Sequence, residues 1–406
     1  PRVGTETTIF SRQFDFDEGG TAFPPPPPPN RVKIAVPPEP LDMAPLQSRR
    51  EQELRVQLDA DRTFQEFVER VKREHDPLVV RRRLLRDGLK LTKTISPSLL
   101  KLVDTVRRIF HVPLELELFV EPSERLELHA ARSAKHGFAY IGISSALIDR
   151  LPQRDLLFLV GVQVGHLMFG HDELPVGPIL RRWRGHLAPA QLLTFLAWRR
   201  YAEISADRVG LLCCQDYETA SECYFKVTSG VTSGKLAFNL NDYLQQLIDI
   251  RSLDEVDTTS DDWFSNHPFS PLRIKALELF SRTDLYQRAS RKGVGVLSYS
   301  LMEENLDEFM AILYPSYAGS DIELTHKIRQ WVTHASLLVA YANGELAREE
   351  IEHIVQLVGH EEVRQTIEQL GTTDPNALFS IVHDTVGPLS EKVIPAQRCQ
   401  IVRDLI

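Results

Sequence analysis

Hydrophobic positions recur at helical spacing along most of this chain, and one region alternates like a strand. Over residues 47–73, large apolar side chains recur every three or four positions among charged ones, which predicts one long amphipathic helix. Helical patterns also follow Pro77 and Pro97. Over residues 114–120 the pattern changes to near-strict alternation, which is typical of a half-buried strand, and we expect short strands to continue to about residue 143.

A helix predicted over residues 154–171 is apolar on nearly every face, which places it at the centre of a folded unit. We expect a partner helix over residues 190–215 and another helix from Pro271. The composition changes near residues 290–297, where we place a domain boundary. The remainder, residues 297–406, is predicted to be helical throughout, and its last helix is still open at the end of the sequence, so we expect this domain to be incomplete.

The first 45 residues form a separate segment that is poor in aliphatic side chains and contains six consecutive prolines. Such a run adopts an extended polyproline II form. It is either a semi-rigid tether or an arm that docks on a neighbouring subunit or an aromatic-lined groove. The prolines of this candidate partner-binding arm are Pro24, Pro25, Pro26, Pro27, Pro28 and Pro29. Residues 46–95 follow as N-terminal helices.

The net charge of −9 excludes a general nucleic-acid binder, which would carry a basic excess. Two basic clusters, residues 81–83 and 181–184, are interpreted as solvated helix faces or partner contacts. The four cysteines form no C-x-x-C pair, which predicts buried free thiols in a reducing compartment. The longest apolar run, residues 156–162, is too short to span a bilayer, and no signal peptide is evident, so we expect a cytoplasmic protein.

The centre of the apolar helix resembles a zinc-binding helix with two residues replaced. In an H-E-x-x-H motif, two histidines four residues apart share one helix face and bind Zn²⁺, and the glutamate acts as general base on the metal-bound water. If His166 takes the second histidine position, Val162 stands at the first and Gln163 at the glutamate. Valine cannot bind a metal and an amide cannot accept a proton from water, so we expect no catalytic residue here.

Four features occur in order along the chain. They are a strand-rich region, the helix with His166, the sequence Glu203-Ile204-Ser205-Ala206-Asp207, and Asn266-His267-Pro268 followed by Arg273. This order, over residues 95–285, resembles the gluzincin zinc metallopeptidase family that contains the CAAX prenyl endopeptidase and the HtpX heat-shock protease. The resemblance implies an α+β, mostly helical zincin-like metallopeptidase fold with a small β-sheet over residues 96–290.

The resemblance also assigns roles to these residues. His166 corresponds to the second zinc ligand and Glu203 to the third, while Asp207 would hold a ligand histidine by a hydrogen bond. A catalytic zinc needs three protein ligands, and this site offers two. His171 would point roughly 140° away from His166 on a continuous helix. We therefore expect an unoccupied remnant and no cofactor, with zinc bound only if a non-standard ligand such as His267 completes the site.

If Glu203 and Asp207 are buried without a metal ion, their negative charge needs compensation from His166 or from an arginine such as Arg273. Nothing in the sequence requires His267 to approach them.

The C-terminal helical region resembles the TerB-like domains of tellurite resistance through residues 335–359. These share an alanine-rich helix, an acidic A-D-G-E turn and a following glutamate-rich helix. Asn343 replaces the aspartate of that turn, which removes support for a metal role. A plain helical bundle with a solvated acidic face is the alternative.

Three hypotheses follow for the function. The first is a catalytically inactive pseudopeptidase that binds a protein partner, or further copies of itself, as a scaffold or assembly subunit. The second is a zinc-dependent endopeptidase with a non-standard metal site. The third is a purely structural subunit in which the arm and the helical domain matter and side chains fill the cleft.

Overall fold

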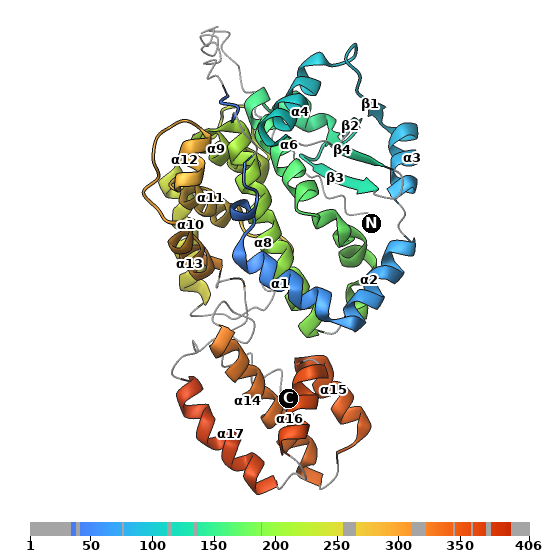
Figure 1. Ribbon diagram of the computed structural model, residues 1–406, viewed down its shortest axis with the longest axis vertical. Helices are drawn as coiled ribbons and strands as arrows, with labels where there is room; N and C mark the ends of the chain where they lie inside the picture. Colours follow the sequence, from blue (N-terminus) through green and yellow to red (C-terminus); the bar gives the residue numbers. More distant parts are fainter. Residues whose placement is uncertain are drawn as a thin grey trace, which may run out of the picture. The chain divides into compact units, whose positions relative to one another are not determined.

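The computed structural model describes most of the chain from residue 34 onward. The described ranges are 34–37, 41–74, 77–111, 116–133, 137–187, 189–254, 265–310, 313, 322–343, 346–358, 360–370 and 375–390. The expected arm with Pro24–Pro29 lies outside them. The α+β prediction is confirmed: helices dominate, and one four-stranded sheet has the order β1-β2-β4-β3 (Figure 1).

Four helices come before strand β2 in the chain: α1 (Arg49–Ala60), α2 (Arg62–Glu74), α3 (Pro77–Asp87) and α4 (Pro97–Phe110). The prediction of a single long helix over residues 47–73 is wrong, because the helix is interrupted at Asp61. The backbone of Asp61 is extended, and its Oδ1 accepts hydrogen bonds from the backbone N of Phe64 at 3.0 Å and from the Thr63 hydroxyl at 2.7 Å. The Asp61 side chain caps the start of α2. The helical spacing of hydrophobic residues continues through Asp61, so it gave no sign of the interruption.

The sheet contains β1 (Leu89–Lys90), β2 (Leu116–Glu121), β3 (Leu128–Ser133) and β4 (Phe138–Ser144). β2 pairs with β4 in parallel, whereas β1 and β3 pair antiparallel at the two edges. Because side chains alternate between the faces of a strand, Leu118 and Ile141 enter the main core while Phe119 and Tyr140 form a small cluster on the opposite face. α3 covers that second face through Leu84.

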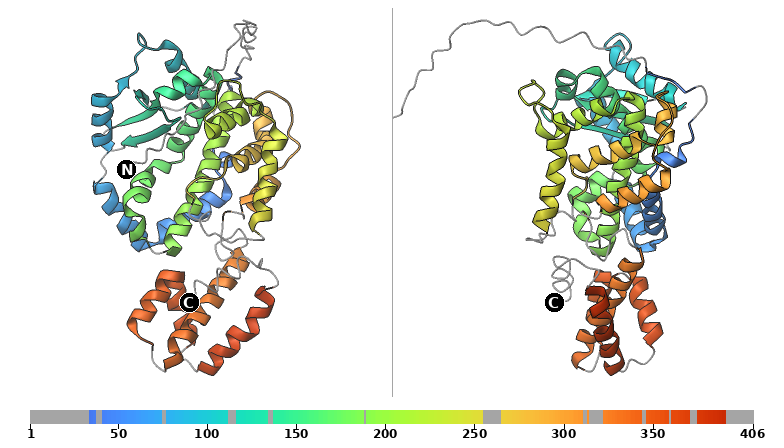
Figure 2. Two further views of the ribbon diagram at one scale, coloured as in Figure 1. Left: turned by 180° about the vertical axis from the view of Figure 1, so that it is seen from behind. Right: turned by 90° about the vertical axis from the view of Figure 1, so that its left-hand side faces the viewer.

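Two long helices form the centre: α6 (Gln153–Met168) and α8 (Pro189–Cys214). Figures 1 and 2 show α6 beside the sheet, with α8 running along its other side. Shorter segments surround them: α5 (Ser145–Arg150), η3 (His171–Glu173), α7 (Val176–Pro178), the π-helical turn Ile179–Trp183, α9 (Tyr217–Ser229), α10 (Leu240–Asp254), α11 (Ser270–Ser281), α12 (Asp284–Ala289) and α13 (Tyr299–Met310). Cys213, Cys214 and Cys223 are buried free thiols.

The C-terminal region is all-helical where it is described. It comprises α14 (Ile322–Ala340), α15 (Arg348–Val358), α16 (His360–Leu370) and α17 (Pro375–Ser390). These helices share a small apolar core that includes Ile328, Ile354, Val363 and Leu378. The last predicted helix, over about residues 390–406, lies outside the described residues except for residue 390.

Candidate functional site

Glycines at the crossing of α6 and α8 bring the two helices close together. A Cβ atom at Gly161 would lie 2.6 Å from the Sγ atom of Cys213, and a Cβ atom at Gly210 would lie 2.6 Å from Cγ2 of Val162. Distances this short leave no room for a side chain, so only glycine fits at these positions. The close crossing places the C-terminal turn of α6, with His166, opposite the middle of α8, with Glu203.

The two positions that depart from the zinc motif differ in their surroundings. Val162 is 3% exposed and belongs to the main hydrophobic core, where it packs against Gly210. The neighbouring Gln163 is half-buried. At the first-ligand position, this chain therefore has an apolar contact that contributes to the packing of α6 on α8.

His166 and Glu203 lie close to one another, and an arginine accompanies them. The Nε2 atom of His166 is 3.6 Å from Oε1 of Glu203. Arg199, one turn before Glu203 on α8, forms an ion pair with the same oxygen, and its Nη1 atom lies 3.5 Å from Nδ1 of His166. A guanidinium group thus contacts both of the residues that the resemblance assigns as zinc ligands.

A second arginine balances the two acids of α8. Arg273, on α11, donates from Nε and Nη2 to the carboxylate of Asp207 at 2.8 and 2.6 Å, and its Nη2 is 2.9 Å from Oε2 of Glu203. Asp207 also accepts a hydrogen bond from the hydroxyl of Tyr224, whose ring lies 4.4 Å beneath the Arg273 guanidinium. Of the two acids, Glu203 is the one beside His166, while Asp207 is held by Arg273 and Tyr224.

His171 lies beside His166, although the sequence predicted that it would point away. The expected geometry assumed that the helix continues to residue 171, whereas α6 ends at Met168 and the chain turns at Gly170, which has φ of 71°. This turn brings Nδ1 of His171 to 2.7 Å from Nδ1 of His166. The prediction was wrong because it placed the helix end three residues too late.

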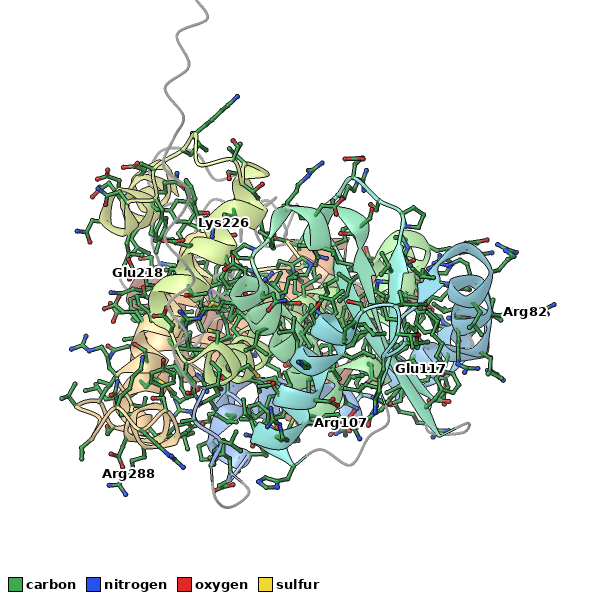
Figure 3. The ribbon with its side chains drawn as sticks, turned by 90° about the horizontal axis from the view of Figure 1, so that it is seen from above. Arg82, Arg107, Glu117, Glu218, Lys226 and Arg288 are labelled. Atoms are coloured by element: carbon green, nitrogen blue, oxygen red, sulfur yellow. The ribbon has the colours of Figure 1, made fainter. Side chains whose placement is uncertain are left out.

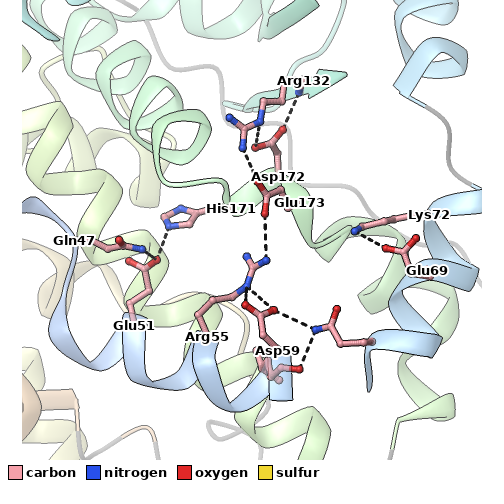
Figure 4. A network of polar contacts seen from close by, with 12 residues as sticks. Gln47, Glu51, Arg55, Asp59, Glu69, Lys72, Arg132, His171, Asp172 and Glu173 are labelled. Carbon is pink, nitrogen blue, oxygen red and sulfur yellow. Dashed lines mark hydrogen bonds and ion pairs between the residues drawn. The ribbon is translucent and has the colours of Figure 1, made fainter. Parts of the chain in front are cut away.

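Glu51 of α1 extends this contact across the molecule. Its Oε1 atom lies 2.8 Å from Nε2 of His171 and also accepts a hydrogen bond from Gln47 at 2.6 Å (Figure 4). Burial alone would raise the pKa of Glu51, but the attraction of His171 and the hydrogen bonds from His171, Ser205 and Gln47 together outweigh it, so the pKa is lowered. Glu51, His171, His166 and Glu203 therefore form a continuous buried chain from α1 to α8.

A second set of ion pairs joins α1, η3 and the edge strand β3. Figure 4 shows Glu173 between Arg55 of α1 and Arg132 of β3, at 3.2 and 2.9 Å. The backbone N of Arg132 donates to Oδ2 of Asp172 at 3.0 Å. A free backbone N–H on an edge strand is what an added extended peptide would use, and here the turn after α6 already occupies it.

His267, in the loop before α11, lies close to the carboxylate of Glu203. Its Nδ1 atom lies 3.2 Å from Oε1 of Glu203, and its side chain is 49% exposed. The structure thus brings together His166, Glu203 and His267, with Asp207 and Arg273 beside them. Among the residues that the structure describes, however, no three His, Cys, Asp or Glu side chains are arranged to hold a metal ion.

The electrostatics of the site follow from burial and the two arginines. Burial lowers the pKa of His166 to about 4, so its ring is neutral at pH 7. Burial would raise the pKa of Glu203, but Arg199 and then Arg273 outweigh it and hold this pKa well below its usual range. Glu203 is therefore an ionised carboxylate whose charge is balanced by guanidinium groups.

The residues present fit a zinc ion poorly in this arrangement. Glu203 is already paired with Arg199 and Arg273. His166 contacts both Glu203 and His171, and His267 contacts Glu203. Gln163 supplies no general base. What the site does supply is a buried polar network that fixes α1, α6, α8 and α11 relative to one another.

Sequence reasoning missed two members of this network. Arg199 precedes Glu203 by four residues, so its spacing on a helix was a readable signal for a charge pair. Glu51 lies more than a hundred residues from its partner His171, and no local pattern indicates such a contact.

Comparison with known proteins supports the metallopeptidase resemblance. Residues 176–280 match the family model described as Peptidase family M48. The chain is 25% identical over 173 residues to the "Plastoglobule-localized metallopeptidase 48, chloroplastic" of Arabidopsis thaliana, and the alignment covers 38% of this chain and 49% of that protein. The chain thus spans about half the length of this curated relative. No solved structure matches.

The matched region contains Glu203, Asp207, His267 and Arg273, and it begins after His166. Residues 176–280 are therefore metallopeptidase-like and similar to peptidase family M48. No helix in the described part of the chain is both long enough and apolar enough to cross a membrane.

Proposed function

We propose that this chain is a catalytically inactive metallopeptidase-like protein that acts by binding protein partners, or further copies of itself, as a scaffold or assembly subunit. The observation that carries the proposal is the pairing of Glu203 with Arg199 and Arg273 beside His166. A metal site keeps such a carboxylate available for the ion. Here two guanidinium groups supply the positive charge that a metal would otherwise provide.

The finer assignments belong to the same proposal. The order of His166, Glu203, Asp207 and Arg273 supports a relationship to the gluzincins of the CAAX endopeptidase and HtpX type. We further propose a TerB-like domain over residues 297–406, a partner-binding arm over residues 1–45 and a cytoplasmic location. The run of prolines over residues 24–29 predicts an extended form of the kind that docks on a neighbouring subunit.

A second candidate function rests on His267. Its approach to Glu203 at 3.2 Å, with His166 at 3.6 Å from the same oxygen, gathers two histidines and one carboxylate. If Arg199 moved aside, these three groups would form a non-standard ligand set for a zinc-dependent endopeptidase. This candidate predicts cleavage of an unfolded protein such as casein that stops on addition of a chelator.

Metal analysis of the purified full chain separates the two candidates. We expect the protein, incubated with zinc and then freed of unbound metal, to retain far less than one equivalent and to leave casein uncut. The comparison variant restores the motif and removes the competing cation, as Val162→His/Gln163→Glu/Arg199→Ala. We expect this variant to retain zinc, provided that its circular dichroism spectrum is unchanged.

The matched control keeps Arg199 while restoring the motif, as Val162→His/Gln163→Glu. It should retain less zinc than the triple variant, because Arg199 still competes for Glu203. One tightly held equivalent of zinc in the unmodified chain, lost in Glu203→Ala, would contradict the inactive assignment and favour the second candidate.

A further inference from the structure

Helix α3 exposes aliphatic and basic side chains, and further exposed residues follow it in β1. Residues 77–95 contain six basic side chains and one acidic side chain, in a chain whose net charge is −9. Val79, Leu85 and Leu89 are exposed by 67%, 49% and 50%. Figure 3 shows Arg82 at the edge of the molecule, directed away from the body.

The inward face of α3 accounts for its orientation. Leu84 is 1% exposed and packs with Phe119 and Tyr140 on the sheet. Arg81 donates from Nε and Nη2 to the carboxylate of Glu117 on β2 at 2.6 and 2.7 Å. Because these contacts fix one side of the helix on the sheet, the opposite side is presented in a defined orientation.

Part of the positive charge on this surface is balanced locally. Glu117 receives Lys90 as well as Arg81, Arg83 lies 3.7 Å from Glu121, and Arg86 pairs with Asp87. The six basic side chains of residues 77–95 thus have three acidic side chains, Glu117, Glu121 and Asp87, as their partners. The exposed Arg82 and Lys93 belong to the remaining excess, so the surface is locally basic in an acidic protein.

We propose that this surface docks on an anionic lipid membrane. The docking face lies on α3 and comprises Val79, Arg82, Leu85 and Arg86. Short aliphatic side chains can enter the boundary between headgroups and acyl chains, while the long arginine side chains reach lipid phosphates. The contact is peripheral, because it uses one face of a short helix.

The composition favours lipid over a protein partner. Residues 77–95 contain no Trp, Tyr, Phe or Met, the side chains that commonly anchor protein interfaces. Aliphatic residues mixed with arginines match the chemistry of an anionic bilayer, whose phosphates attract basic residues near its surface.

Co-sedimentation of the full chain with lipid vesicles tests the proposal. We expect binding to vesicles of phosphatidylcholine mixed with phosphatidylglycerol, weak binding to phosphatidylcholine alone, and release at high salt. Each basic residue near an anionic surface strengthens binding about fivefold, so Arg82→Glu should weaken it about 25-fold. Leu85→Ser should also weaken binding at low salt, because it removes an aliphatic side chain from the docking face.

Arg288→Glu is the matched control. Arg288 lies on α12, away from Arg82 in Figure 3, and its side chain is 70% exposed. It should leave vesicle binding unchanged apart from the small effect of net charge. Three results would each overturn the proposal: failure of the full chain to sediment with anionic vesicles, equal losses for Arg82→Glu and Arg288→Glu, or self-association that Arg82→Glu abolishes while vesicles stay unbound.

Discussion

Arg199 is the residue on which the interpretation of the site depends, because it neutralises a carboxylate that would otherwise be buried without enough positive charge. Glu203 is 3% exposed and keeps only Arg273 and the histidines when Arg199 is removed. Breaking one partner of a buried ion pair costs about 3–5 kcal/mol. We expect Arg199→Ala to lower the free energy of unfolding by about 3 kcal/mol, at the low end because Arg273 remains.

Urea unfolding measures this effect, and a double variant identifies its cause. Glu203→Gln removes the buried charge, so Arg199→Ala/Glu203→Gln should be more stable than Arg199→Ala alone. Arg348→Ala, which removes an exposed pair with Glu352, is the control and should change stability by less than about 1 kcal/mol. If the double variant is no more stable than Arg199→Ala, charge compensation is not the role of Arg199.

Gly210 allows α6 and α8 to cross closely, and its substitution tests that packing. A Cβ atom there would lie 2.6 Å from Val162 and 2.8 Å from the backbone oxygen of Phe158, which cannot rotate away. Overpacking of this kind costs about 1–3 kcal/mol, so Gly210→Ala should lower the melting temperature measured by circular dichroism. Gly185→Ala, in the 3₁₀ turn Arg184–His186 with open space around the new methyl group, is the control and should change the melting temperature little.

At the scale of elements, ion pairs from Arg81 of α3 and Lys90 of β1 to Glu117 join both elements to β2. Hydrogen bonding from Arg81, supported by Lys90, outweighs burial and lowers the pKa of Glu117 to about 2. The folded-state pKa is below the unfolded one, so this stabilisation is present above about pH 4.5 and is lost as the pH falls towards 2.

The shift alone corresponds to about 3 kcal/mol, but solvent screening of this partly exposed cluster reduces the expected contribution to about 1 kcal/mol. We therefore expect Glu117→Gln to be less stable than the unmodified protein at pH 7 and nearly equal to it at pH 2.5, by urea unfolding. Glu124→Gln, at a side chain that is 93% exposed, should show no such convergence. A constant difference at both pH values would contradict the assigned pair.

The helices and strands were predictable wherever hydrophobic spacing had one interpretation. The helix over Pro97–Phe110 and the strand alternation around Leu118 are both set by local pattern, and both are present. The break at Asp61 and the end of α6 before His171 were not predicted, because each depends on a single polar side chain or glycine within a continuing apolar pattern. In the site, Glu203 and Arg273 were predictable from motif order, whereas Glu51 was not, because its partner is distant in sequence.

At the scale of the whole molecule, α13 connects the region after the proposed boundary near residues 290–297 to the central helices. Glu303 of α13 accepts hydrogen bonds from the Ser48 hydroxyl at 2.9 Å and the backbone N of Arg49 at 3.1 Å, and it pairs with Arg208 of α8 at 2.6 Å. One buried carboxylate therefore joins the start of α1, the middle of α8 and α13. These contacts indicate that α13 contributes to the stability of the metallopeptidase-like domain.

Truncation determines where that domain ends. A chain that stops at Ser298 loses Glu303 and the buried side chains of Met302, Leu306 and Met310, which are at most 2% exposed. Burial of each such side chain contributes about 2 kcal/mol, and the sum is comparable to the whole stability of a typical domain of about 5–15 kcal/mol. We expect this chain to lack a cooperative thermal transition, whereas a chain that stops at Gly319 keeps α13 and unfolds cooperatively. Cooperative unfolding of the Ser298 chain would instead support a boundary near residues 290–297.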